Sequence, residues 1–411
     1  MPMDSGTASH TVLAPSSVGN LGDEAMLTSA IRNIRERSTK PIVVLTHKDD
    51  DDWSHIDPEI RQVSLEGFFS PLSWRRAADT LLSQIGTSST FNVLGADIMD
   101  GAYSASRTFR RLLMLELAAS RGVDSAILGF SYSDKANPES VRYLQSFGGS
   151  VTKYARDPGS HARLEAISPE GLHLVADTAF LLKPSQGEST EVRRIVSAIE
   201  QARADGKRVI AFNANPLGAA MSAGAKRGNE SVSELDGIVV RNVEAILRSL
   251  PDVHLVFVSH DPREPHNDAR LLESVFARLS PELSSRITLA TRGIGARDVK
   301  LLCSMTDLVV TGRMHMGIAA LGSGTPCYFL DFQGKVRGLL EHFGIAEMCC
   351  GWDVYSDAKR YAESVVHFLN HRDDYRAKLH AELPRIREMA ARNFERFGQQ
   401  SNTRLDDAAS R

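Results

Sequence analysis

Short runs of apolar residues alternate along this chain with longer stretches in which apolar residues recur every three or four positions. HTVLAP precedes the amphipathic stretch GDEAMLTSAIRNIRER, and PIVVL, FNVLG and SAILGF follow as further apolar runs. Strands that are separated by helices pair most readily in parallel, because each helix returns the chain to the same end of the sheet. The alternation therefore predicts an α/β fold with a parallel, helix-covered sheet.

The alternation breaks once, in the segment LLKPSQGEST, where Pro, Gly, Ser and Thr cluster. A second series then runs from KRVIAFN to CYFLDF, and a chain of 411 residues is longer than one core usually serves. We predict two Rossmann-like doubly wound domains that face a cleft, at residues 1–185 and 186–352. Residues 353–411 are expected to form C-terminal helices and a flexible tail.

Composition narrows the class of partner. The formal net charge is −3, which provides no basic field for nucleic acid. The four cysteines form no C-x-x-C pair, and no standard metal-ligand spacing occurs, so neither a metal nor a cofactor is expected. The N-terminus lacks the basic and apolar regions of a signal peptide, and no apolar run approaches the ~20 residues that span a bilayer. These features predict a cytoplasmic protein.

In open parallel sheets, ligands bind beyond the carboxyl ends of the strands, so the residues directly after each strand are the informative ones. Two such segments of the first domain, SSVGNLGDEA and LGADIMDGAYS, combine glycines with polar groups suited to an anion or a sugar. Their candidate residues are Gly19, Asn20, Gly22 and Asp23, and then Asp97, Asp100 and Tyr103. Ordinary capped turns remain an alternative for both, and Asp157 in YARDPGSHARL is expected to cap a helix.

The second domain has three segments of this kind. FNANPLG places Asn213 and Asn215 at a strand end, although Asn also favours turns. SHDPREPHND carries His260, for which ligand contact and an ordinary loop role both stay open.

The third segment, TGRMHMGIAALGSGTP, predicts a helix that is apolar nearly all round and therefore buried. Its start is the exception, because Gly312, Arg313 and His315 fall there, and Lys335 follows the next strand. Helix-start amides attract anions, and the Arg fork matches carboxylate or phosphate. An Arg–Asp interdomain pair with a hydrogen-bonded core His is the structural alternative. Because several cations converge, we favour an anionic ligand.

Three blocks of the sequence resemble the polysaccharide pyruvyl transferase family. GNLGDEAML is similar to its N-terminal signature, YARDPGSHARL with VADTAFLL to its middle block, and DLVVTGRMHMGIAALGSGTPCYFLDFQGKVRGLLEHFGI to its C-terminal block. The resemblance implies a GT-B-like pair of domains, with acceptor binding on the N-terminal side and donor binding on the C-terminal side.

The resemblance further implies phosphoenolpyruvate as co-substrate and a sugar of an exopolysaccharide or cell-surface glycan precursor as acceptor. A pyruvate ketal and phosphate would be the products. In the family, the Arg and His of the R-x-H motif act at the donor site, which implies catalytic roles for Arg313 and His315. A group that titrates near neutral pH can both take and give a proton, so His315 is the expected acid–base residue.

Two other functions fit the same architecture: a nucleotide-sugar glycosyltransferase, and a non-catalytic relative that binds a sugar or an anion. The basic stretches SWRR and RTFRR offer a further alternative, peripheral contact with the inner face of a membrane that carries a lipid-linked saccharide acceptor. A solvated helix face is the simpler interpretation of those stretches.

Overall fold

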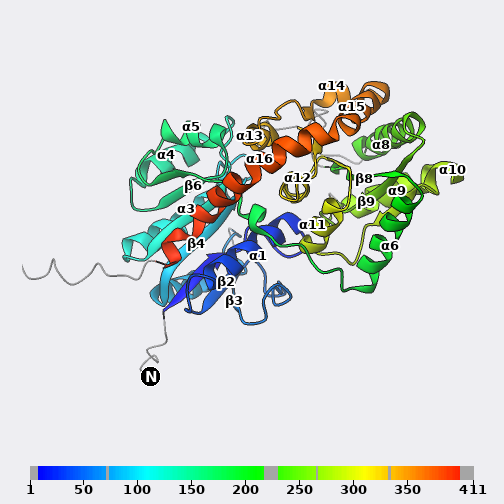
Figure 1. Cartoon of the computed structure of the whole chain (residues 1–411). Coiled ribbons are helices and arrows are strands. Elements are labelled where there is room, and N and C mark those ends of the chain that lie inside the picture. Colours follow the sequence, from blue (N-terminus) through cyan, green and yellow to red (C-terminus); the bar gives the residue numbers. More distant parts are fainter. Residues whose placement is uncertain (1–7, 71–73, 217–229, 265–266, 332–334, 399–411) are drawn as a thin grey trace, which may run out of the picture.

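Two parallel sheets, each covered by helices, make up the protein (Figure 1). The computed structural model describes residues 8–70, 74–216, 230–264, 267–331 and 335–398, without the side chains of 230–234 and 335. The first sheet has seven strands in the order β3-β2-β1-β4-β5-β6-β7, and the second has six in the order β10-β9-β8-β11-β12-β13. Both are doubly wound Rossmann orders. The predicted fold class is confirmed.

The strands are short and mostly buried. Their bounds are β1 (Ser9–Leu13), β2 (Ile42–Thr46), β3 (Arg61–Ser64), β4 (Ser88–Ala96), β5 (Asp124–Phe130), β6 (Thr152–Ala155), β7 (Leu172–Leu174), β8 (Arg208–Phe212), β9 (Val253–Val258), β10 (Ile287–Ala290), β11 (Leu308–Thr311), β12 (Cys327–Leu330) and β13 (Cys349–Cys350). β3 and β13 were not expected. β3 lies at an edge and is partly exposed, and β13 has two residues, so neither has the apolar run that marks a buried strand.

The first domain contains helices α1 (Leu21–Arg35), α2 (Trp74–Gly86), α3 (Ala105–Ser120), α4 (Pro138–Ser146), α5 (Pro158–Glu165) and the 3₁₀ helix η1 (Thr178–Leu181). One apolar cluster joins α2, α3, α4 and α5 to one face of its sheet, and a second joins α1 to the other face. The helices after η1 are α6 (Thr190–Ala204), α8 (Glu230–Ser249), α9 (Asp268–Arg278), α10 (Pro281–Ser284), α11 (Ala296–Ser304), α12 (Met314–Leu321) and α13 (Lys335–Glu341).

The C-terminal helices return the chain to the first domain. They are α14 (Trp352–Tyr355), α15 (Ala358–Asn370), α16 (Arg372–Ala391) and the 3₁₀ helix η2 (Arg392–Gly398). Figure 1 shows α16 crossing from the second domain to the first. Phe394 and Phe397 of η2 are buried in the same cluster as α1, and Arg396 forms an ion pair with Asp124. The chain therefore connects its two domains twice, once after η1 and again through α16. The predicted C-terminal tail falls in residues 399–411 except for its first residue, and these lie outside the described residues.

Strand order reverses between β1 and β4 in the first sheet and between β8 and β11 in the second. At such a point the connecting helices diverge to opposite faces, which leaves a crevice beyond the strand ends. α1 packs against α11 and α12, so the two crevices meet at the first turn of α1. Within the described residues, none of the helices is both long and apolar enough to cross a membrane.

Candidate active site

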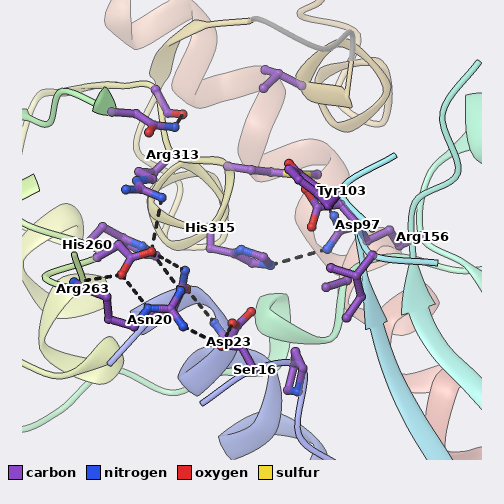
Figure 2. A pocket seen from close by; sticks show the side chains of 18 of the residues that line it. Ser16, Asn20, Asp23, Asp97, Tyr103, Arg156, His260, Arg263, Arg313 and His315 are labelled. Carbon is purple, nitrogen blue, oxygen red and sulfur yellow. Dashed lines mark hydrogen bonds and ion pairs between the residues drawn. The ribbon is translucent and has the colours of Figure 1, made fainter. Parts of the chain in front are cut away.

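A cavity of about 280 Å³ lies between the domains at the carboxyl ends of the central strands (Figure 2). Both domains line it. The first domain contributes Pro15, Ser16, Asn20, Asp23, Ala96, Asp97, Ile98, Tyr103 and Arg156, and the second contributes Asn215, His260, Asp261, Arg263, Gly312, Arg313, Met314, His315, Asp331 and Val336. Most of the residues that the sequence marked at strand ends thus come together at one place.

His315 stands at the start of α12 and lines the cavity. From Met316 to its end this helix is buried, which its apolar sequence predicts, whereas the His315 side chain remains 14% exposed. Its Nε2 lies 3.5 Å from Oδ2 of Asp177 and 3.5 Å from Nη1 of Arg156. Both neighbours belong to the first domain, so the imidazole of one domain faces a charged pair of the other.

Arg156 and Asp177 form a buried ion pair. Arg156 Nη1 donates to Asp177 Oδ2 at 2.6 Å, and the side chains are only 1% and 2% exposed. Burial would raise the pKa of Asp177, but the Arg156 cation, with His315, brings it to about 2. Arg156 Nε also donates to Ser131 Oγ at 2.7 Å. Both side chains are therefore charged and held in place beside His315.

The sequence placed Arg156 at the end of a strand, but neither Arg156 nor Asp177 was among the candidate residues. Both follow strands of the first sheet, β6 and β7, and this position at a carboxyl end is the signal that could have found them. The neighbouring residue fits its expectation: Asp157 caps α5, accepting a hydrogen bond from the backbone N–H of Ser160.

Arg313 is the N-cap residue of α12 and lies at the cavity wall. It forms an ion pair with Asp268, with Nη2 to Oδ1 at 2.5 Å and Nε to both carboxylate oxygens at 3.2 Å. Nη1 lies 3.5 Å from Oδ2 of Asp261. The Arg313 cation is therefore already paired with carboxylates. The Arg–Asp pair also lies within the second domain, not between domains.

A second group of contacts joins the domains through the loop before α1. Asn20 Oδ1 accepts from the N–H groups of Gly22 and Asp23, and its Nδ2 donates to Oδ2 of Asp261 at 3.0 Å. Arg263 holds the same carboxylate and donates from Nη1 to Ser16 Oγ at 2.8 Å. Asn20 is thus a helix cap as well as a cavity residue, and the N–H groups of Gly22 and Asp23 are already hydrogen-bonded to it.

Asp23 faces the cavity from the first turn of α1 (Figure 2). Ser16 Oγ donates a hydrogen bond to its Oδ2. Burial raises the pKa of Asp23, against the opposing effects of this hydrogen bond and of the His315 and Arg263 charges. A carboxyl group with a raised pKa, close to an imidazole, is suited to proton transfer.

Three glycines allow close approach of the backbone. A Cβ on Gly22 would lie 2.5 Å from His315 Nδ1, so α1 can approach α12 only with glycine there. A Cβ on Gly312 would lie 2.9 Å from that of Asn215, which itself lines the cavity. Gly19 has φ +108°, the left-handed region that favours glycine, and packs beside Arg263.

Further candidate residues line the cavity. His260 lines the cavity, and burial, helped by His315 and Arg313, lowers its pKa to about 3. Asp97 and Tyr103 also line it, with Tyr103 Oη donating to Asp97 Oδ2 at 3.0 Å.

The structure does not bring Asn213 or Asp100 to the cavity wall. Asn213 donates to Val258 O and Asp268 Oδ2 beneath it. Asp100 is buried in its loop and accepts from Ala102 N. The Lys335 side chain lies outside the described residues. Within the described part of the chain, no group of three or more His, Cys, Asp and Glu could hold a metal ion.

Two Rossmann domains with a polar cleft between them define a protein of GT-B-like architecture. UDP-GlcNAc 2-epimerase from Neisseria meningitidis, solved with UDP-GlcNAc bound, has a similar structure, with a TM-score of 0.59, 14% identity and coverage of 95% of this chain and 98% of that one. The UDP-GlcNAc 2-epimerase of Methanocaldococcus jannaschii gives a TM-score of 0.55 at 14% identity, covering 88% and 93%. A ugt transferase from Siraitia grosvenorii in complex with UDP gives 0.57 at 11%, covering 95% and 98%. At such identities the likeness shows the fold alone.

The family is given by sequence. The model of the polysaccharide pyruvyl transferase family matches residues 20–333, and this chain belongs to that family of transferases. The match covers most of both domains and includes Arg156, Asp177, Arg313 and His315. The comparison with curated proteins gives no match.

Proposed function

We propose that this protein transfers the pyruvyl group of phosphoenolpyruvate to two hydroxyls of a sugar, forming a cyclic ketal and releasing phosphate. The observation that carries the proposal is the position of His315. The imidazole lines the interdomain cavity and lies 3.5 Å from both members of the Arg156–Asp177 pair. A cleft that joins an acid–base group to fixed cations suits transfer from a small anionic donor.

The donor would bind on the cationic side of the cavity. Phosphoenolpyruvate carries about three negative charges near neutral pH. Asp268 holds the Arg313 guanidinium in one orientation at the wall, and Arg156 is held likewise by Asp177 and Ser131. A cation fixed in advance loses little entropy when it meets a planar carboxylate or a phosphate. A cavity of about 280 Å³ is near the lower limit for ligand sites, which favours a small donor.

The reaction needs a proton at the methylene carbon of the donor. His315 would supply it, which leaves C2 electron-deficient, and a sugar hydroxyl would then form the first C2–O bond. The C2–O bond to phosphate breaks, and a second hydroxyl closes the ketal. Of the two hydroxyl protons, one replaces the proton that went to the methyl group and the other leaves with phosphate.

Asp23 would accept the proton of the attacking hydroxyl. It belongs to the first domain, opposite His315, and burial raises its pKa. The two groups therefore lie on the two sides of the cavity where donor and acceptor must meet. Asp97 and Tyr103 would bind acceptor hydroxyls at the outer part of the same wall.

The test is phosphate release from phosphoenolpyruvate in the presence of a panel of glycosides and lipid-linked saccharides, with UDP-sugars as competing donors. We expect release with at least one acceptor and no consumption of UDP-sugars. His315→Ala should keep phosphoenolpyruvate binding but lose about 10²–10⁴-fold in turnover. His371→Ala, an exposed histidine of the C-terminal helices, is the matched control.

Arg313 needs a gentler change, because removing it would leave the buried Asp268 carboxylate without its cation. Arg313→Lys keeps the charge and removes the fork, so the protein should fold while phosphoenolpyruvate binds more weakly. Wild-type turnover by His315→Ala would refute the assignment of the acid. Tight ligand binding without phosphate release for any acceptor would favour a non-catalytic relative.

A further inference from the structure

The exposed large apolar side chains of the described residues all fall in one part of the first domain. They are Trp74, Tyr103 and Phe109, which are 51%, 40% and 48% exposed. Aromatic side chains of this size usually lie buried, so exposing them costs free energy unless a partner covers them. Their concentration between residues 74 and 109 of a 411-residue chain needs an explanation.

Arginine side chains of α3 link this helix to α2 and to the segment before it. Arg110 of α3 donates from Nη1 to the carbonyl oxygens of Phe68 and Ser70, just before α2. Arg121, at the end of α3, donates to Leu82 O of α2. Both helices pack on the same face of the sheet, and each begins at its carboxyl edge because each follows a strand of that sheet.

Trp74 is placed unusually for an exposed residue. It occupies the same stripe of α2 as Ala77, Leu81 and Ile85, which are buried in the core. The apolar stripe of α2 therefore extends beyond the core, and Trp74 at its N-terminal end is half-exposed. Phe109 stands on the outer face of α3, in edge contact with Tyr143 at 5.0 Å. Tyr103 lines the mouth of the cavity, so the aromatic surface continues into the candidate active site.

Arginines accompany the aromatic groups. Arg75, Arg76 and Arg107 are exposed on the first turns of the same two helices. Between described residues, none of their side chains takes part in an ion pair. Elsewhere on the surface many arginines do, as with Arg194 and Glu191. A surface of unpaired arginines beside half-exposed aromatic rings matches an interface between water and an anionic bilayer, where both kinds of side chain are stabilised.

We propose that Trp74, Arg75, Arg76, Arg107 and Phe109 form a docking surface for an anionic membrane. The protein sits on the bilayer by this surface. The cavity mouth at Tyr103 then faces the lipid headgroups. If the proposed transfer is correct, an acceptor tethered to a lipid reaches the cavity without leaving the membrane. The docking itself does not depend on the transfer reaction.

Sedimentation with vesicles tests the docking surface without any activity assay. The full chain should sediment with vesicles of phosphatidylcholine and phosphatidylglycerol at low salt, and not with phosphatidylcholine alone. Raising the salt should release it, because screening weakens exposed charges. Arg75→Ser with Arg76→Ser should weaken binding about thirty-fold, and Trp74→Ser with Phe109→Ser at least about tenfold.

The matched control changes two exposed arginines of the second domain, Arg248→Ser with Arg278→Ser, and should bind like the wild type. Thermal unfolding confirms that each variant is folded. The proposal would be overturned if the docking-surface variants bound vesicles as well as the control does. It would also be overturned if the wild type did not bind anionic vesicles. Self-association that Trp74→Ser with Phe109→Ser abolishes, without vesicle binding, would show instead a contact between copies of the chain.

Discussion

Gly22→Ala tests whether the position of His315 controls the reaction. The new methyl carbon would lie 2.5 Å from Nδ1, 2.7 Å from Cγ and 2.8 Å from Cβ of His315. Ordinary contacts between such atoms are about 3.5 Å or longer, so the ring has to move by about 1 Å or change rotamer. A catalytic group misplaced by about 1 Å costs about 10²-fold in rate. We expect turnover to fall by that factor.

The same substitution should leave the fold intact. Gly22 is the second residue of α1 and has no positive φ, and alanine is the better helix former by up to about 1 kcal/mol. Phosphoenolpyruvate binding should change little, because the three atoms nearest to the new methyl group all belong to His315 and not to the cations that we assign to the donor. Steady-state phosphate release, with KM and kcat separated, measures the effect. Gly86→Ala is the control, since its methyl group would meet no described atom within 4 Å.

A double variant makes the test sharper. If Gly22→Ala acts only through His315, it should slow His315→Ala no further, because the group it displaces is already gone. Additive losses would show that Gly22 acts by another route, such as domain closure. Wild-type turnover by folded Gly22→Ala would refute the reasoning from its contact distances.

Three further predictions concern stability. The pKa of His260 is lowered from 6.5 to about 3, so between pH 6.5 and 5 only the unfolded chain takes up a proton at this residue. His260 alone should therefore lower the unfolding free energy by about 2 kcal/mol over this pH range. Urea unfolding of His260→Gln at pH 6.5 and pH 5 should show a smaller drop in unfolding free energy than the wild type shows. An equal drop in both proteins would contradict this. Asp177→Asn leaves the buried Arg156 without its carboxylate and should cost about 3 kcal/mol, while Glu191→Gln in an exposed pair should cost under about 1 kcal/mol. Asn20→Ala removes a helix cap and a contact to the second domain, so we expect about 1–2 kcal/mol lost in thermal unfolding; stability equal to the wild type would count against the cap.

Local pattern determined much of the fold. The apolar runs predicted β1, β2 and the other buried strands, because a strand covered on both faces must be apolar throughout. The alternation predicted two parallel, helix-covered sheets. The sequence also predicted the apolar helix with a polar start, because its core-facing residues are apolar whereas His315, which faces the cavity, is polar.

Tertiary structure decided which charges meet. Arg156 and Asp177 are 21 residues apart, and His315 lies 159 residues from Arg156, so no local pattern records their approach. The partner of Arg313 was likewise open until the loop after β9 placed Asp268 beside it. The return of η2 to the first domain depends on where α16 ends in space, not on its own sequence.

The sequence by itself therefore determined the elements, their parallel order and the strand ends where polar residues gather, because each of these depends on burial within a few neighbouring residues. Only the tertiary structure decided that two carboxylates hold Arg313, that a charged pair faces His315, and that the helices carrying the exposed Trp74 and Phe109 cover the same face of the first sheet. Those arrangements depend on how two domains close on each other, and the energies that select them act between residues far apart in the chain.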